Sequence, residues 1–195
     1  MKTLYLMRHG QTLFNEQKKI QGWCDSPLTQ KGIEQAKIAG NYFLDQGISF
    51  DQAYCSTSER ASDTLEIVTN QSMDYKRLKG LKEWNFGAFE GKDEFLNPSY
   101  PYGDFFKAYG GESDMELRKS VSNTILAIMQ KKDHDSVLVV SHGASCGQFV
   151  LNWEHETRGP KFKKGIQNCA IFKFEFENDK FHLVEIINHD FSHLD

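Results

Sequence analysis

The stretch TLYLMRHG, residues 3–10, joins an apolar run of β-forming residues to a turn marked by a glycine. This pattern predicts a buried strand that ends on the polar residues Arg8 and His9. A second apolar run, SVLVV at residues 136–140, leads in the same way into Ser141-His142-Gly143. A continuous apolar run suits a strand that helices cover on both faces. The two strand ends could therefore bring His9 and His142 into one site.

Helical patterns alternate with the strands. Thr29 is a candidate N-cap for a helix over about residues 30–46, where apolar residues recur on one face. The other expected elements are a strand over 53–56, helices over 58–68 and 117–129, a helix that opens at 141–144, and a β-hairpin around Asn178-Asp179 at the edge of the sheet.

This alternation predicts one α/β domain over residues 1–195, a three-layer α/β/α fold with a mostly parallel central sheet. A chain of 195 residues, 39% of them hydrophobic, is long enough for one substantial core and too short for two large domains. Ligands of such sheets bind outside the carboxyl ends of the strands.

Composition argues against several functional classes. The formal net charge of −4 disfavours nucleic-acid binding, and no apolar run approaches the roughly 20 residues of a membrane span. The four cysteines are widely spaced, and the N-terminus begins a strand and not a signal peptide, which favours the cytoplasm. Five histidines lack ligand-like spacing, so we expect solvated or capping roles for them and no metal: His134, His155, His182, His189 and His193.

Two arginines and two histidines at one site suit a dianionic phosphoryl group. Guanidinium groups bind phosphate oxygens bidentately and keep their charge, which assigns Arg8 and Arg60 to the phosphate. A neutral imidazole can attack phosphorus through one ring nitrogen while the other donates its proton, which makes His9 the candidate nucleophile. A protonated His142 would stabilise the transferred charge. Taken singly, His9 could be structural and Arg60 an ordinary surface arginine.

The leaving alkoxide needs a proton and the second step needs an activated water. A buried carboxylic acid can serve both tasks, and Glu83 is the best candidate. Glu90 and Glu94 lie close by in the sequence, and composition alone does not choose among the three.

Five stretches together carry a family resemblance. They are LYLMRHGQT at residues 4–12, followed by Asn15, GWCDSPLT at 22–29, CSTSERASDT at 55–64, LKEWNFGAFEG at 81–91 and VVSHG at 139–143. In order and spacing they resemble the histidine phosphatase (phosphoglycerate mutase-like) superfamily across nearly the whole chain. The resemblance implies a metal-independent, cofactor-free enzyme with an RHG motif. It implies these roles: His9 as phosphohistidine; Arg8, Arg60 and His142 as phosphate ligands; Glu83 as proton donor; Asn15, Gln21, Gly22 and Gly143 as substrate contacts.

The resemblance favours the phosphatase branch acting on a small-molecule phosphate ester. The mutase branch usually has E-R-x-Y-G at the acid segment and an adjacent arginine pair, whereas here Trp84 follows the acid and no R-R occurs. Lys92 and Lys107 offer little extra positive charge for a phosphorylated carboxylic acid. A cofactor-dependent phosphoglycerate mutase is the alternative, and a catalytically silent phospho-ligand-binding module is the alternative of another class. The substrate and the formation of a homo-oligomer stay open.

The segment 91–111 is rich in aromatic residues and contains Pro98 and Pro101. It suits a loop or short helices that cover the pocket as a lid, or a part of the core. As a lid, its rings would contact the part of the substrate that is not phosphate.

Overall fold

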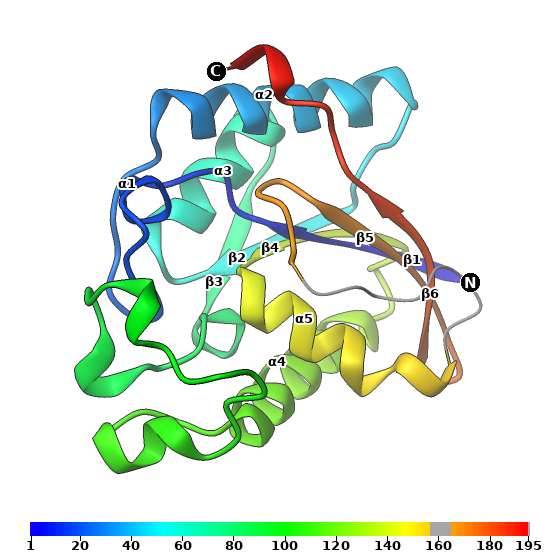
Figure 1. Ribbon diagram of the computed structural model, residues 1–195. Helices are drawn as coiled ribbons and strands as arrows, with labels where there is room; N and C mark the ends of the chain where they lie inside the picture. Colours follow the sequence, from blue (N-terminus) through cyan, green and yellow to red (C-terminus); the bar gives the residue numbers. More distant parts are fainter. Residues whose placement is uncertain (157–164, 195) are drawn as a thin grey trace.

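The computed structural model describes residues 1–156 and 165–194, and its centre is a six-stranded sheet in the order β3-β2-β4-β1-β5-β6 (Figure 1). Strands β1 to β4 run parallel, and β5 pairs antiparallel with both β1 and β6. The strands are β1 (Lys2–Arg8), β2 (Gln52–Ser56), β3 (Tyr75–Leu78), β4 (Ser136–Ser141), β5 (Ile171–Glu177) and β6 (Lys180–Ile187).

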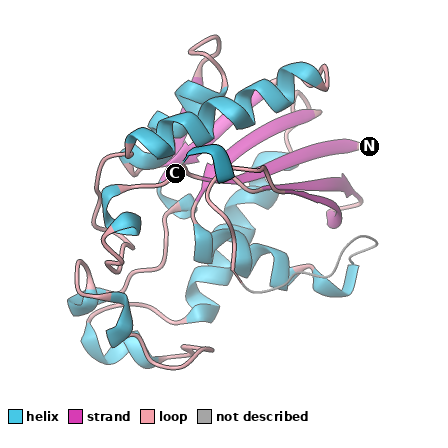
Figure 2. Ribbon diagram, turned by 45° about the horizontal axis from the view of Figure 1, so that its top comes forward, coloured by secondary structure: helices cyan, strands magenta, loops and turns pink. Residues whose placement is uncertain are grey.

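Helices cover both faces of this sheet, which confirms the three-layer α/β/α fold (Figure 2). Helices α2 and α3 lie on one face, and α4 and α5 lie on the other. The α-helices are α1 (Leu13–Glu16), α2 (Gln30–Asp45), α3 (Glu59–Val68), α4 (Asp114–Met129) and α5 (Gly143–Asn152). Short 3-10 turns are η1 (Lys79–Leu81), η2 (Gly87–Phe89), η3 (Glu94–Leu96), η4 (Phe105–Tyr109), η5 (Glu154–Glu156) and η6 (Ser192–Leu194).

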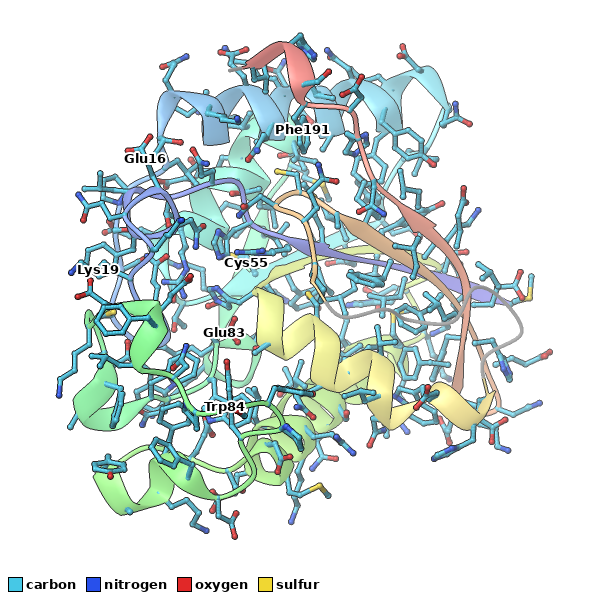
Figure 3. The ribbon with its side chains drawn as sticks, in the orientation of Figure 1. Glu16, Lys19, Cys55, Glu83, Trp84 and Phe191 are labelled. Carbon is cyan, nitrogen blue, oxygen red and sulfur yellow. The ribbon has the colours of Figure 1, made fainter. Side chains whose placement is uncertain are left out.

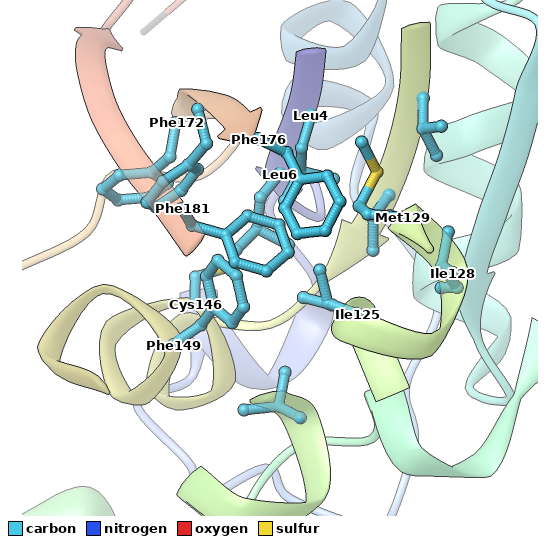
Figure 4. Packing of buried hydrophobic residues seen from close by; sticks show 14 of the residues in the cluster. Leu4, Leu6, Ile125, Ile128, Met129, Cys146, Phe149, Phe172, Phe176 and Phe181 are labelled. Atoms are coloured by element: carbon cyan, nitrogen blue, oxygen red, sulfur yellow. The ribbon is translucent and has the colours of Figure 1, made fainter. Parts of the chain in front are cut away.

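Alternating residues of β1 divide the core into two halves. Leu4 and Leu6 point to the α4 and α5 side, where aromatic residues such as Phe149 fill the space between helix and sheet (Figure 4). Tyr5 and Met7 point to the α2 and α3 side. There they share a cluster with Cys55 and Phe191, both labelled in Figure 3. A strand buried on both faces shows this pattern because its side chains alternate while the whole run stays apolar.

Local signals fix most element boundaries. The Thr29 hydroxyl accepts a hydrogen bond from the Gly32 amide at 3.0 Å, which confirms the predicted N-cap of α2. Helix α4 begins at Asp114, three residues before the expected start, because Ser113 and Glu116 form a capping box there. The C-terminal hairpin turns at Asn178-Asp179, both with positive φ, and β6 forms the sheet edge as expected.

The sequence patterns missed strand β3 at the opposite edge. Lys76 and Arg77 occupy its centre and are exposed, so the segment lacks the apolar alternation of a typical strand. Backbone pairing with β2 makes it a strand, and charged side chains are common on edge strands because they discourage further pairing.

Two of the five histidines for which we expected solvated or capping roles are not solvated, and one of these, His182, contacts the last residue of η5, as a capping residue does. His134 and His182 are buried, not solvated: His134 lies 2.6 Å from the Tyr54 hydroxyl, and His182 lies 2.6 Å from the carbonyl oxygen of Glu156. None of the helices in the described ranges has the length and apolar character needed to cross a membrane. A cytoplasmic location stays a prediction.

The core gives a stability prediction. Phe149 is fully buried, with its ring 5.1 Å from Phe174 and 5.0 Å from Phe181. Phe149→Ala should lower the free energy of unfolding by about 3–5 kcal/mol, because it removes buried surface and leaves a cavity. Phe95→Ala is the matched control, since Phe95 is 81% exposed. This variant should change the free energy of unfolding by less than about 0.5 kcal/mol. Urea unfolding measures both, and equal effects would contradict this description of the core.

Candidate active site

The carboxyl ends of three parallel strands place the predicted residues together. Arg8 ends β1 opposite Ser141, the last residue of β4, and His142 follows Ser141 directly. The ring centroids of His9 and His142 are 5.2 Å apart, as expected for residues that end adjacent strands. Arg60 reaches the same place from the first turn of α3, just beyond the end of β2.

His9 is held in a single orientation and tautomer. Its Nδ1 atom lies 2.7 Å from the carbonyl oxygen of Gly10, which can only accept a hydrogen bond. The proton of the neutral ring therefore sits on Nδ1, and Nε2 carries a free lone pair. Burial, and after it the charges of Arg60 and Arg8, lower the pKa of His9 well below its usual value. The ring is a neutral base with one available nitrogen.

His142 is fully buried, and neither of its ring nitrogens has a hydrogen-bond partner. Buried polar atoms nearly always have partners, so a ring with two unsatisfied nitrogens marks a place suited to a polar ligand. Burial, followed by the charge of Arg60, lowers the pKa of His142 well below its usual value. We expected a protonated His142, whereas burial and the two neighbouring cations favour the neutral ring.

Arg60 is fully buried and is held by the loop 22–25. Its guanidinium donates to the carbonyl oxygens of Gly22 at 2.8 Å and Cys24 at 3.0 Å, and to the carboxylate of Asp25 at 2.7 Å. Arg60 is therefore not an ordinary surface arginine. The Nε atom of Arg60 has no partner, which leaves donor capacity for a ligand.

A cavity of about 280 Å³ opens in front of Arg8. One guanidinium nitrogen of Arg8 donates to the carbonyl oxygen of Ile166, while its Nε atom has no partner. Burial lowers the pKa of Arg8, and the carboxylate of Glu83 acts in the opposite direction. The ordinary value is so high that the group stays charged.

The three candidate acids occupy different environments. Glu83 is buried and lines the cavity beside the first turn of α5 (Figure 3), where it accepts hydrogen bonds from the amides of Ala144 at 2.8 Å and Ser145 at 3.0 Å. Glu94 lines the cavity but is exposed. Glu90 lies outside the lining, with backbone amides around its carboxylate. Geometry therefore favours Glu83.

Three of the four expected substrate contacts line the cavity: Asn15, Gln21 and Gly143. Gly22 does not line it and instead holds Arg60 through its carbonyl. A Cβ atom at Gly22 would lie 1.9 Å from the carbonyl oxygen of Trp84, so only glycine allows this approach.

Sequence reasoning missed much of the cavity wall. Lining residues that lie outside every quoted motif include Lys19, Ile20, Gln148, Leu151 and Ile166. Trp84 and Phe86 lie within the segment LKEWNFGAFEG, but no contact with a ligand was predicted for them. The segment 91–111 serves both expected purposes: Phe106 is fully buried in an aromatic cluster, whereas Asn97, Tyr100 and Tyr102 line the cavity. Movement of this segment as a lid stays a prediction.

No group of three or more His, Cys, Asp or Glu side chains that could hold a metal ion occurs in the part of the chain that the structure describes. The cavity presents the guanidinium of Arg8 and the carboxyl group of Glu83, a pair that suits an anionic ligand and a proton transfer, whereas His9, Arg60 and His142 lie outside its lining.

Residues 4–189 match the model of the histidine phosphatase superfamily (branch 1), and the chain belongs to this family. A 2,3-bisphosphoglycerate-dependent phosphoglycerate mutase from Bacteroides fragilis is 28% identical over 92% of this chain and 88% of its own. A phosphoserine phosphatase from Entamoeba histolytica, solved in complex with 3-phosphoglyceric acid, is 28% identical with a TM-score of 0.78 over 98% of this chain and 99% of its own. A phosphoglycerate mutase from Bacillus anthracis is 27% identical with a TM-score of 0.83 over 95% and 92%.

The lowered pKa values of the histidines predict a pH dependence. A histidine whose pKa is lower in the folded chain than in the unfolded chain costs stability as the pH falls below the unfolded value, because the unfolded chain then binds more protons. The free energy of unfolding should therefore decrease below about pH 6.5.

NMR titration should find the rings of His9 and His142 neutral at pH 6, and inorganic phosphate should raise the pKa of His142. Titration of both rings near the usual histidine pKa in the absence of phosphate would contradict this prediction.

Proposed function

We propose that this chain is a metal-independent phosphomonoester hydrolase that acts on a small-molecule phosphate ester through a phosphohistidine on His9. The observation that carries the proposal is the free Nε2 lone pair of His9, on a ring that lies 5.2 Å from the ring of His142 and close to two arginines that each keep an unpartnered nitrogen. Membership of the histidine phosphatase superfamily supports it.

In the first step, the phosphate dianion binds Arg8, Arg60 and His142. Its charge raises the pKa of His142, which then donates a hydrogen bond to a phosphate oxygen. Nε2 of His9 attacks phosphorus, the bond from phosphorus to the ester oxygen breaks, and its electron pair stays with that oxygen. Glu83 gives its proton to this leaving oxygen. The products are the alcohol and a phosphohistidine.

In the second step, the Glu83 carboxylate takes a proton from water while the water oxygen attacks phosphorus. The bond between phosphorus and Nε2 breaks, its electron pair returns to the His9 ring, and inorganic phosphate leaves. The amides of Ala144 and Ser145 keep the carboxyl group oriented through both steps.

The charges around the cavity favour hydrolysis over the mutase reaction. Lys107 pairs with Glu116 at 3.2 Å, Lys92 lies over the ring of Phe89, and neither lines the cavity. Lys19 does line it, but it already pairs with Asp93 at 2.6 Å. Within the described residues, little positive charge is therefore free for a substrate carboxylate. A phosphoglycerate mutase stays the alternative, because curated relatives at 28% identity have that activity.

The size and walls of the cavity suit a small alcohol. A volume of about 280 Å³ holds a small molecule, and the rings of Trp84, Phe86 and Tyr102 form an apolar side against which its carbon skeleton can pack. The phosphoserine phosphatase with the same fold binds small phosphorylated acids of this size.

The first prediction concerns His9. With chelator present, wild-type protein should release phosphate from phosphomonoesters and form an acid-labile phosphoenzyme, and His9→Ala should lose both, because it lacks the nucleophile. A malachite green assay and rapid-quench labelling measure the two. Conversion of 3-phosphoglycerate in the presence of a bisphosphate primer, without release, would instead indicate a mutase. Absence of activity in both assays would favour a phospho-ligand-binding module without catalysis.

The second prediction concerns Glu83. Glu83→Gln should reduce kcat/KM for alkyl phosphates by about 100-fold or more, the usual size of general acid catalysis, and much less for nitrophenyl phosphate. An activated aryl leaving group departs without a proton, so it depends little on the acid. Glu94→Gln is the control and should affect both substrates alike. Equal losses for both substrates in Glu83→Gln would exclude Glu83 as the acid.

A further inference from the structure

Glu90 is a carboxylate that the proposed chemistry does not use, and its surroundings are unusual. It accepts hydrogen bonds from four backbone amides. Three belong to consecutive residues of one loop, Gly22 at 3.0 Å, Trp23 at 2.8 Å and Cys24 at 3.1 Å. The fourth is the amide of Phe86 at 3.1 Å, in the segment that carries Glu83. Hydrogen bonds to a charged acceptor are among the strongest in proteins.

The same loop holds Arg60 from its other side. While the loop amides point at Glu90, the carbonyl oxygens of Gly22 and Cys24 accept the guanidinium of Arg60 at 2.8 and 3.0 Å. The next residue, Asp25, adds its carboxylate at 2.7 Å. A peptide group cannot move at one end without turning at the other, because it is planar. The peptide group between Gly22 and Trp23 therefore links Arg60 to Glu90 directly, because its carbonyl oxygen binds Arg60 and its N–H binds Glu90.

The loop approaches Glu90 so closely at Gly22 that a side chain at this position would not fit. A Cβ atom at Gly22 would lie 2.5 Å from Oε1 of Glu90 and 1.9 Å from the carbonyl oxygen of Trp84. The chain just before the loop is also tied to the residues that follow Glu90, since the Ile20 amide donates to the Lys92 carbonyl at 2.7 Å. The contact is therefore close-packed.

We propose that Glu90 is a positioning residue that fixes the Arg60 guanidinium where it binds the phosphate, a role that rests on the proposed function. Glu90 itself does not touch the substrate. Through the Phe86 amide it also sets the distance between the Arg60 loop and the segment of Glu83. One carboxylate thereby aligns the phosphate ligand with the proton donor.

Glu90→Gln tests this role with little change in shape. The amide nitrogen would replace either Oε1, which serves Trp23 and Phe86, or Oε2, which serves Gly22 and Cys24. In both cases two amides meet a donor and lose their acceptor. The loop should shift, and a misplacement of about 1 Å in a site can cost about 100-fold in rate.

The first readout is the binding of inorganic phosphate, measured by titration calorimetry, which needs no turnover. Glu90→Gln should weaken it by about 10-fold, and kcat/KM should fall by about 10- to 100-fold for alkyl and aryl phosphates alike. This pattern differs from that of Glu83→Gln, because Arg60 holds the phosphate whatever the leaving group is. Glu90→Asp keeps the charge and two acceptors, and should recover part of the affinity.

Glu112→Gln is the matched control. Its Oε1 accepts one amide, that of Asn85 at 2.7 Å, in the same segment, and an amide oxygen can take its place. Phosphate affinity should stay within about twofold of the wild type. Combining Glu90→Gln with Arg60→Ala tests the coupling: once Arg60 is absent, Glu90→Gln should weaken phosphate binding no further.

The outcomes separate this role from the proposed function. A Glu90→Gln protein that melts earlier yet binds phosphate as tightly as the wild type would show a merely structural carboxylate, and would overturn the proposal. So would losses confined to alkyl phosphates, or full additivity with Arg60→Ala. Wild-type protein whose phosphate binding depends on Arg60 and Glu90 but that hydrolyses no ester would overturn only the hydrolase, and absence of phosphate binding would overturn both.

Discussion

The buried guanidinium of Arg60 is the constraint on which the rest of the site depends. A cation without access to water is costly unless every part of it is paired, and here two carbonyl oxygens and the Asp25 carboxylate supply most of the pairing. Arg60 lies on α3, and its acceptors lie on the loop 22–25. Helix and loop must therefore keep a fixed relative position, which Glu90 and the close approach at Gly22 secure from the other side.

Burial, together with the same positive charges, decides the state of the two histidines. Next to Arg8 and Arg60, and out of contact with water, His9 and His142 both have lowered pKa values and are neutral. A nucleophile must be neutral, and the hydrogen bond from Nδ1 of His9 to Gly10 makes Nε2 the available nitrogen. A phosphate dianion would offset the surrounding charge and favour the protonated form of His142. The site thus suits a phosphate ester, in which the anionic group also contains the bond that breaks.

Local sequence patterns predicted the strands that are buried on both faces and the helix that begins with a side-chain N-cap. Strands β1 and β4 are apolar throughout because helices cover both faces, and Thr29 marks the start of α2 through its own hydroxyl. Strand β3 was missed because its pairing with β2, and not its composition, makes it a strand. His134 and His182 were expected in solvated or capping roles, and their burial was missed because burial of a single polar side chain leaves no trace in the neighbouring sequence.

The sequence by itself determined which groups come together: the turns after two apolar runs carry Arg8, His9 and His142, and residue type and spacing were enough to predict phosphate ligands and a nucleophile among them. Only the tertiary structure decided how those groups are held. It placed Glu83 and not Glu90 in the cavity, moved Gly22 from substrate contact to the support of Arg60, and assembled an aromatic wall from distant segments. The reason is physical: residue type records what a group can do, whereas burial, orientation and partners arise only when segments far apart in the chain pack together.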